Sequence, residues 1–114
     1  MLTIEVEPLE RCTLIRLEGD ADHAAASELE QRLLAEIDAG HATLVINGRD
    51  LAYISSAGLR ALIAAQTRAR RSQPPGKIVF AELSAPVRRT FEMVGFHQLF
   101  QMYTTEAEAT GSIK

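Results

Sequence analysis

The chain has 114 residues and a formal net charge of −3 at pH 7, and 46% of its residues are hydrophobic while 24% are charged. These values are typical of a single globular domain, which we place at residues 1–114, with a core large enough to fold without a metal or a disulfide. The acidic balance argues against nucleic-acid binding, because that function usually needs a basic surplus.

The N-terminal segment has the pattern of a strand rather than that of a targeting signal. Leu2, Ile4 and Val6 alternate with polar residues up to Pro8, which predicts a half-buried strand. The segment lacks the basic start and long apolar run of a signal peptide, and no part of the chain approaches the roughly 20 apolar residues of a membrane span. We therefore expect a cytoplasmic protein without membrane insertion.

A second strand is predicted over residues 11–17, joined to the first through a hairpin at 8–10. Cys12 and Leu14 share one face of this strand. Because Cys12 is the single cysteine, no intrachain disulfide can form, and we expect its side chain to pack as a small core residue.

The first helix is predicted over residues 23–39, after a break in the strand pattern at 19–22. Its apolar residues recur at intervals of three and four, namely Ala26, Leu29, Leu33 and Ile37. Asp22 is the predicted N-cap, since its carboxylate can accept hydrogen bonds from the free N–H groups of the first turn.

An almost wholly apolar strand follows at residues 42–46, which is typical of a central strand covered on both faces. We predict a turn at 47–50 and a short apolar segment at 51–54. A second amphipathic helix begins after Ser56 and ends in the basic run Arg68, Arg70 and Arg71. This run is expected to be a solvated helix end, where cations are favoured, with a phosphate or acidic-partner site as the alternative.

The C-terminal third is predicted to alternate strands and short helices. After a loop at 72–76, the elements are a strand at 77–83, a helix opened by 84–86 and closed by Gly95, a strand at 98–103 and a small helix at 106–109. Thr104 or Thr105 is expected to cap the last helix, and residues 110–114 are expected to be frayed. In the preceding helix region, core packing is expected for Phe91, Met93, Val94 and Phe96, with an exposed patch as the alternative for Met93 and Phe96.

The predicted order of elements is β-β-α-β-α-β-α-β-α. Strands that alternate with helices favour an α/β fold, with a mixed, mostly parallel sheet of about four or five strands and helices packed on it.

The residues that usually carry catalysis are scattered along this chain. The histidines, His23, His41 and His97, lie in different segments without metal-ligand spacing. The serines lack a Gly-x-Ser-x-Gly elbow, and no phosphate-cradling loop occurs. We therefore predict a protein that is not an enzyme, with no catalytic residues, no cofactor and no bound metal.

Two adjacent hydroxyls stand where an apolar strand meets the second helix, at Ser55 and Ser56. A serine at a helix N-terminus can cap free backbone N–H groups. The same position also favours a phosphate, because the helix dipole attracts negative charge. On the residues alone, capping and phosphorylation both remain open.

The segment Ser55-Ser56-Ala57-Gly58-Leu59, after Tyr53-Ile54, resembles the STAS domain family, and more narrowly the bacterial anti-sigma factor antagonists. The loop at 19–23, the Gly95-Phe96 pair and the order of elements extend the resemblance over nearly the whole chain.

The resemblance implies a regulatory phosphoprotein. In such proteins, the unphosphorylated form binds a serine-protein kinase that is also an anti-sigma factor, phosphorylation abolishes that binding, and a metal-dependent serine phosphatase restores it. Alignment on Gly58-Leu59 makes Ser56 the expected acceptor. Well-known members often carry Asp just before the acceptor, so Ser55 departs from the pattern and stays the second choice.

The resemblance also implies a partner-binding surface, and we expect a monomer. The expected contact residues are Asp20, Asp22, His23, Ser55, Ser56, Ala57, Gly58, Leu59 and Arg60. Two other functions of STAS domains remain as alternatives: a module that senses a small ligand or nucleotide, and an unphosphorylated subunit of a lipid-transport complex.

Overall fold

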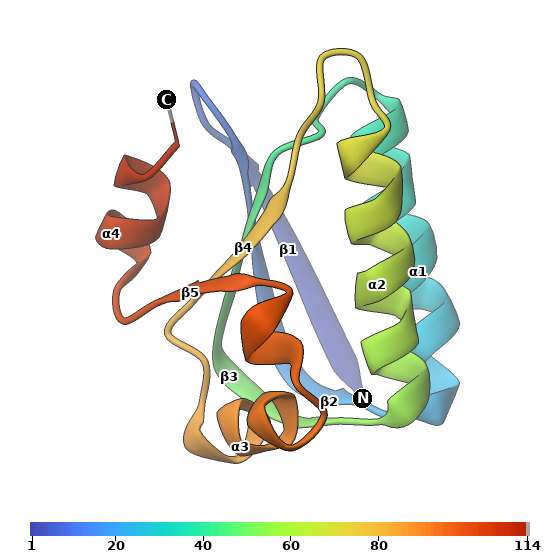
Figure 1. The fold of residues 1–114 in the computed structure, drawn as a ribbon. Helices are drawn as coiled ribbons and strands as arrows, with labels where there is room; N and C mark the ends of the chain where they lie inside the picture. The colour runs from blue at the N-terminus through green and yellow to red at the C-terminus, as the bar shows by residue number, and fades with distance from the viewer. Residues whose placement is uncertain (114) are drawn as a thin grey trace.

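A five-stranded mixed sheet forms the centre of the computed structural model, which describes residues 1–113 (Figure 1). Its strands follow the order β1-β2-β3-β4-β5. β1 pairs antiparallel with β2, and all later neighbours are parallel. The strands are β1 Leu2–Pro8, β2 Thr13–Ala21, β3 Leu44–Ile54, β4 Ile78–Ala81 and β5 Gln101–Tyr103.

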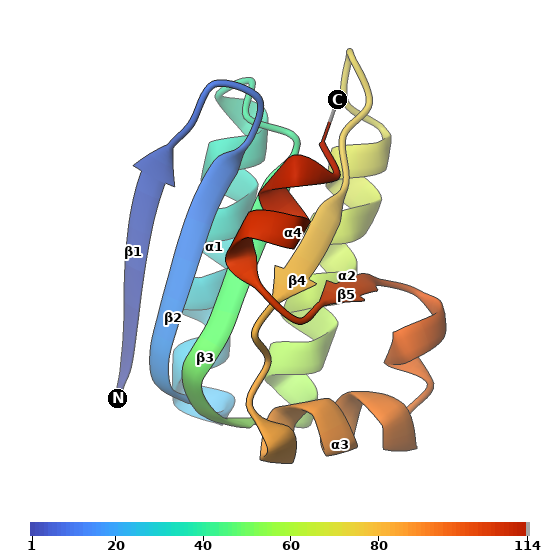
Figure 2. The ribbon, with the colours of Figure 1, turned by 90° about the vertical axis from the view of Figure 1, so that its left-hand side faces the viewer.

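Helices cover both faces of this sheet. α1 and α2 lie side by side on one face, whereas α4 lies on the other and α3 lies at the end of the sheet where β2 and β3 finish (Figures 1 and 2). The helices are α1 His23–Asp38, α2 Ser56–Arg70, α3 Ala85–Met93 and α4 Glu106–Gly111, with a 3-10 turn, η1, at Phe96–Gln98. The predicted α/β fold, its number of strands and its order of elements are confirmed.

The main core lies between the sheet and the pair α1 and α2. The apolar side chains that the periodicity of α1 predicts, Ala26, Leu29, Leu33 and Ile37, are the buried ones. Leu44, Val45 and Ile46 are completely buried, as predicted for a central strand. Near α3, the Phe80 and Phe91 rings meet edge to face with centroids 5.1 Å apart.

A smaller core lies on the opposite face, under α4. Cys12, Leu14, Val45, Val79, Ala81, Ala109 and Ile113 form it. The predicted fraying of residues 110–114 differs from the structure over 110–113: α4 extends to Gly111, and Ile113 is 8% exposed because the sheet face offers it an apolar site. Lys114 lies outside the described residues.

Four other local predictions were wrong. The expected turn at 47–50 and the expected break at 19–22 lie largely within strands, because β2 and β3 pair along their length up to Ala21 and Ile54, with two register shifts. The strand expected at 98–103 is reduced to β5, since η1 occupies its start. Met93 and Val94 are 85% and 51% exposed, so they do not belong to the core.

Candidate functional site

The N-termini of α1 and α2 meet at the edge of the sheet where β2 and β3 end. Ala21 and Ile54, the last residues of these strands, are register partners. The Ser55 N–H donates to the Ala21 carbonyl at 2.9 Å; Ser55 directly precedes α2, and Ala21 lies two residues before α1. This hydrogen bond brings together the two predicted contact segments, 20–23 and 55–60.

Each helix is capped by a side chain at this edge. The Asp22 carboxylate accepts the Ala25 N–H at 2.9 Å, which confirms the predicted cap of α1. The Ser55 hydroxyl oxygen accepts the Gly58 N–H at 3.1 Å and caps α2. Capping is therefore the structural role of Ser55.

Ser56 has a different environment from Ser55. It is the first residue of α2 and its side chain is exposed, whereas Ser55 is half-buried. The Ser56 hydroxyl takes part in none of the side-chain hydrogen bonds found among residues 1–113. Of the two hydroxyls, that of Ser56 is the accessible one.

Gly58 lets the first turn of α2 approach the strands closely. A Cβ atom at this position would lie 2.8 Å from Ile54 Cγ1 and 3.0 Å from the Ala21 carbonyl oxygen. Leu59 is buried beside it, with 8% of its surface exposed. Gly58 and Leu59 thus hold the turn against the core, and the exposed side chains of the predicted segment are those of Ser56 and Arg60.

A groove of about 350 Å³ runs between the first turns of α1 and α2. Its lining residues are His23, Ala26, Ser27, Glu30, Gln31, Ala57 and Arg60. His23 and Arg60 are both exposed, and neither forms an ion pair within residues 1–113. The groove therefore joins residues predicted from two separate segments.

Tyr53 also belongs to this edge, although it was not among the predicted contact residues. It is the register partner of Asp20 and is 51% exposed. Simple alternation would place Tyr53 on the same side as Leu51, which is buried. Its exposure was therefore not evident from the sequence, because β3 has one extra residue between Leu51 and Tyr53 relative to Gly19 and Asp20 of β2. Its ring adds a flat apolar surface next to a half-buried carboxylate.

The structure offers little for metal or thiol chemistry. Within residues 1–113, no group of three or more His, Cys, Asp or Glu side chains is arranged to hold a metal ion. Cys12 is buried, and desolvation raises the pKa of its thiol. In the same range, every helix is too short or too polar to cross a membrane.

Comparisons with known proteins identify the family of this chain. The sequence profile of the STAS domain matches residues 3–109. The chain belongs to the STAS domain family. This STAS domain is 31% identical over 113 residues to BtrV of Bordetella bronchiseptica, assigned as an anti-sigma factor antagonist, with 99% of this chain and 96% of BtrV covered.

Solved structures of other STAS proteins share the fold. An anti-sigma factor antagonist from Mycobacterium paratuberculosis matches with a TM-score of 0.87 at 23% identity, covering 99% of this chain and 94% of that one. The antagonist SpoIIAA in its unphosphorylated form matches with a TM-score of 0.80 at 24% identity, over 95% and 93% of the two chains. The phosphorylated form of SpoIIAA, from Bacillus, matches with a TM-score of 0.75 at 22% identity, covering 98% of this chain and 100% of that one. The resemblance expected from the sequence is confirmed at the level of family and fold.

Proposed function

We propose that this STAS domain is an anti-sigma factor antagonist that works as a phosphorylation-controlled partner switch. The unphosphorylated form binds a serine-protein kinase that is also an anti-sigma factor, and so releases the target of that kinase. Phosphorylation of Ser56 abolishes the binding, and a metal-dependent phosphatase reverses it. The similarity to BtrV supports the class, and SpoIIAA exists in both an unphosphorylated and a phosphorylated form.

The observation that carries the proposal is the difference between the two serines. A kinase must bring the acceptor hydroxyl into its own active site, so the acceptor has to be exposed. Ser56 meets this need at the first position of α2, whereas the Ser55 oxygen is 3.1 Å from the Gly58 nitrogen that it caps. We therefore assign Ser56 as the acceptor.

A phosphate at Ser56 is compatible with the folded state. It adds about −1.5 to −2 charges at pH 7, next to the free N–H groups and positive dipole end of α2. Arg60 lies four residues further along α2, on the same side of the helix, and its side chain is exposed. Both features stabilise the phosphorylated protein, so the switch acts on binding and not on folding.

The same charge weakens binding because of what already surrounds the site. Asp20 and Asp22 lie at the adjoining end of β2, beside the Ser55–Ala21 hydrogen bond. The phosphate thus adds to two existing carboxylates on the docking surface, and a partner that meets this edge with apolar or acidic groups is repelled. A change of about 3 kcal/mol is enough for a hundredfold loss of affinity.

The test begins with the phosphorylated residue. Trypsin cuts after Arg49 and Arg60, and the resulting peptide 50–60 contains Ser55 and Ser56 as its only serines or threonines. After incubation with the anti-sigma kinase of the same organism and ATP, fragmentation of this peptide should place the phosphate on Ser56. Phosphate on Ser55 would keep the switch but refute the assignment.

The second part of the test measures binding to that kinase by calorimetry. Ser56→Ala should bind as tightly as the unmodified protein and resist phosphorylation, whereas Ser56→Asp should bind at least tenfold more weakly. Thr67→Asp is the matched control, because it adds the same charge to an exposed position of α2 remote from the helix start. Equal affinity of Ser56→Asp and Thr67→Asp would refute the charge mechanism.

A further inference from the structure

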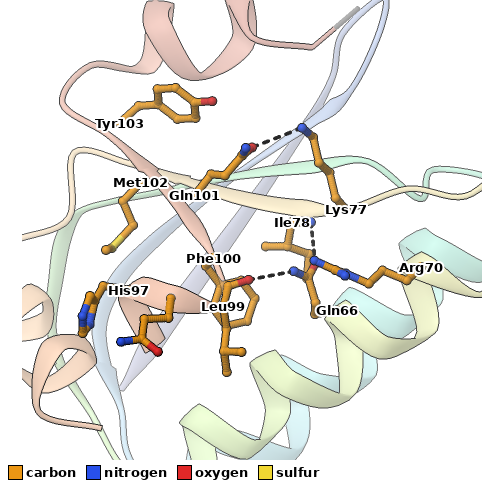
Figure 3. A pocket seen from close by; sticks show the side chains of 11 residues that line it. Gln66, Arg70, Lys77, Ile78, His97, Leu99, Phe100, Gln101, Met102 and Tyr103 are labelled. Carbon is orange, nitrogen blue, oxygen red and sulfur yellow. Dashed lines mark hydrogen bonds between the residues drawn. The ribbon is translucent and has the colours of Figure 1, made fainter. Parts of the chain in front are cut away.

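A separate cavity of about 560 Å³ lies at the opposite end of α2 from Ser56 (Figure 3). It is open to solvent on one side and is bordered by the last turns of α2, the start of β4 and the segment from η1 through β5. Its lining residues are Gln66, Arg70, Lys77, Ile78, His97, Gln98, Leu99, Phe100, Gln101, Met102 and Tyr103. The volume is in the range of small-molecule sites.

Two cationic side chains, Arg70 and Lys77, line this cavity, although the chain as a whole carries a net charge of −3. Among residues 1–113, no carboxylate lines it, and neither Arg70 nor Lys77 forms an ion pair. Within the same residues, the hydrogen bond found for the Lys77 ammonium goes to a neutral acceptor, the Gln101 side-chain oxygen, at 3.1 Å. These donors are available to an anion.

The floor of the cavity is held in place before any ligand arrives. The Gln66 side chain is 9% exposed; its oxygen accepts the Ile78 N–H at 2.8 Å and its nitrogen donates to the Leu99 carbonyl at 3.3 Å. One amide thus ties α2 to β4 and to the segment before β5 (Figure 3). Because this floor is already ordered, a ligand loses little binding free energy to ordering it.

Apolar surface lies next to the cationic groups. Leu99 is 50% exposed at the rim, and Phe100 and Met102 contribute further apolar lining. A ligand with a dianionic group and a flat apolar body would satisfy both parts of the cavity: the anion can accept from Arg70 and Lys77, and the body can cover Leu99 and Met102. Inorganic phosphate would use only the first part.

We propose that this cavity binds a small organic phosphate monoester. The site is distinct from the partner-binding edge, because the rise of 1.5 Å per residue along α2 places Arg70 about 21 Å from Ser56. The proposal therefore does not depend on the phosphorylation of Ser56.

The test is a titration of the ¹⁵N-labelled full chain with phenyl phosphate, followed by NMR. We expect saturable shifts at the amides of Lys77, Ile78 and residues 99–102, with tighter binding than for inorganic phosphate. Arg70→Gln and Lys77→Gln should each weaken the affinity about tenfold, as loss of one charge-assisted contact does. Arg71→Gln, which removes the same charge from the exposed neighbour outside the cavity, should leave the affinity unchanged.

Other results would overturn the proposal. Equal losses in Arg70→Gln and Arg71→Gln would mean general attraction of anions to the helix end. Equal affinity for inorganic phosphate and phenyl phosphate would mean that the apolar lining is not used, and no saturation up to about 10 mM would mean that no site exists. Ser56→Asp should bind phenyl phosphate like the unmodified protein, so a failed partner switch and a failed ligand site give different results.

Discussion

The Ser55 hydroxyl oxygen lies 3.1 Å from the Gly58 backbone nitrogen, so the first of two adjacent serines is the N-cap of α2. The second is left exposed at the same helix end. Two residues of the same type, one peptide bond apart, thus differ in structural role: Ser55 caps the helix, and Ser56 is exposed and is the proposed phosphorylation site. The Asp that often precedes the acceptor in the family would cap the helix equally well.

Ser55→Ala should lower the free energy of unfolding by about 1 kcal/mol, because it removes the side-chain acceptor of the Gly58 N–H. Ser55→Asp should restore most of this loss, since aspartate is also a good N-cap. Urea denaturation followed by circular dichroism measures both. Ser56→Ala is the matched control and should change stability by less than about 0.5 kcal/mol, as expected for an exposed side chain. Equal losses in Ser55→Ala and Ser56→Ala would contradict the separate roles.

Gly58→Ala should destabilise the protein although alanine is the better helix former. The new methyl group would lie 2.8 Å from Ile54 Cγ1 and 3.0 Å from the Ala21 oxygen. Overpacking of this kind costs about 1–3 kcal/mol, against a helix-propensity gain of up to about 1. Gly111→Ala is the comparison, because no atom lies within 4 Å of a Cβ at that position of α4. A stability gain in Gly58→Ala would show that the first turn of α2 is not tightly seated.

Phe91→Ala should cost about 3–5 kcal/mol, since the Phe91 side chain is fully buried and meets Phe80 edge to face at 5.1 Å. Met93→Ala, two residues along α3, should change stability by less than about 0.5 kcal/mol because Met93 is 85% exposed. Thermal or urea unfolding of the pair tests which face of α3 is packed. Similar losses in both would refute that orientation.

The Cys12 thiol should react slowly with an aromatic disulfide reagent in the native protein at pH 8, and rapidly in urea. Burial raises the pKa of this thiol, so the native state holds the proton more tightly than the unfolded chain does. As pH rises past about 8.5, the ordinary pKa of a thiol, the unfolded chain loses its proton before the native state does. The free energy of unfolding therefore falls as pH rises through this range. Cys12→Ala should remove that part of the pH dependence. Rapid native-state labelling would contradict the buried position.

The order and type of the elements could be predicted from the sequence because each has a strong local signal. The periodicity of α1 and its Asp22 cap are examples that the structure confirms. The prediction of a turn at 47–50 was wrong because contacts with residues distant in the sequence hold this segment in a strand. Gly48 packs inside β3, where a Cβ would lie 2.6 Å from Leu83 Cδ2, and its carbonyl accepts the Ser84 N–H. A window of neighbouring residues contains neither contact.

The candidate site was partly predictable. Carboxyl ends of adjacent parallel strands meet at one edge, so the segments after β2 and β3 had to approach each other. The choice between Ser55 and Ser56 was left open by spacing, because it depends on which side chain turns back to the Gly58 N–H. The cavity near Arg70 was also beyond the sequence, since it needs α2, β4 and the segment before β5 to be in place. The predicted partners, the monomeric state and the absence of catalysis stay predictions.

The strand order β1-β2-β3-β4-β5 places each strand beside its predecessor along the chain. Each strand can therefore pair as soon as the strand before it is in place, without waiting for a later part of the chain. The entropy lost in closing each connection between neighbouring strands stays small. During synthesis, every new βα unit can dock on the sheet already formed at the ribosome. A sheet built in this way should fold quickly for a parallel topology, with little time for an unpaired edge to aggregate.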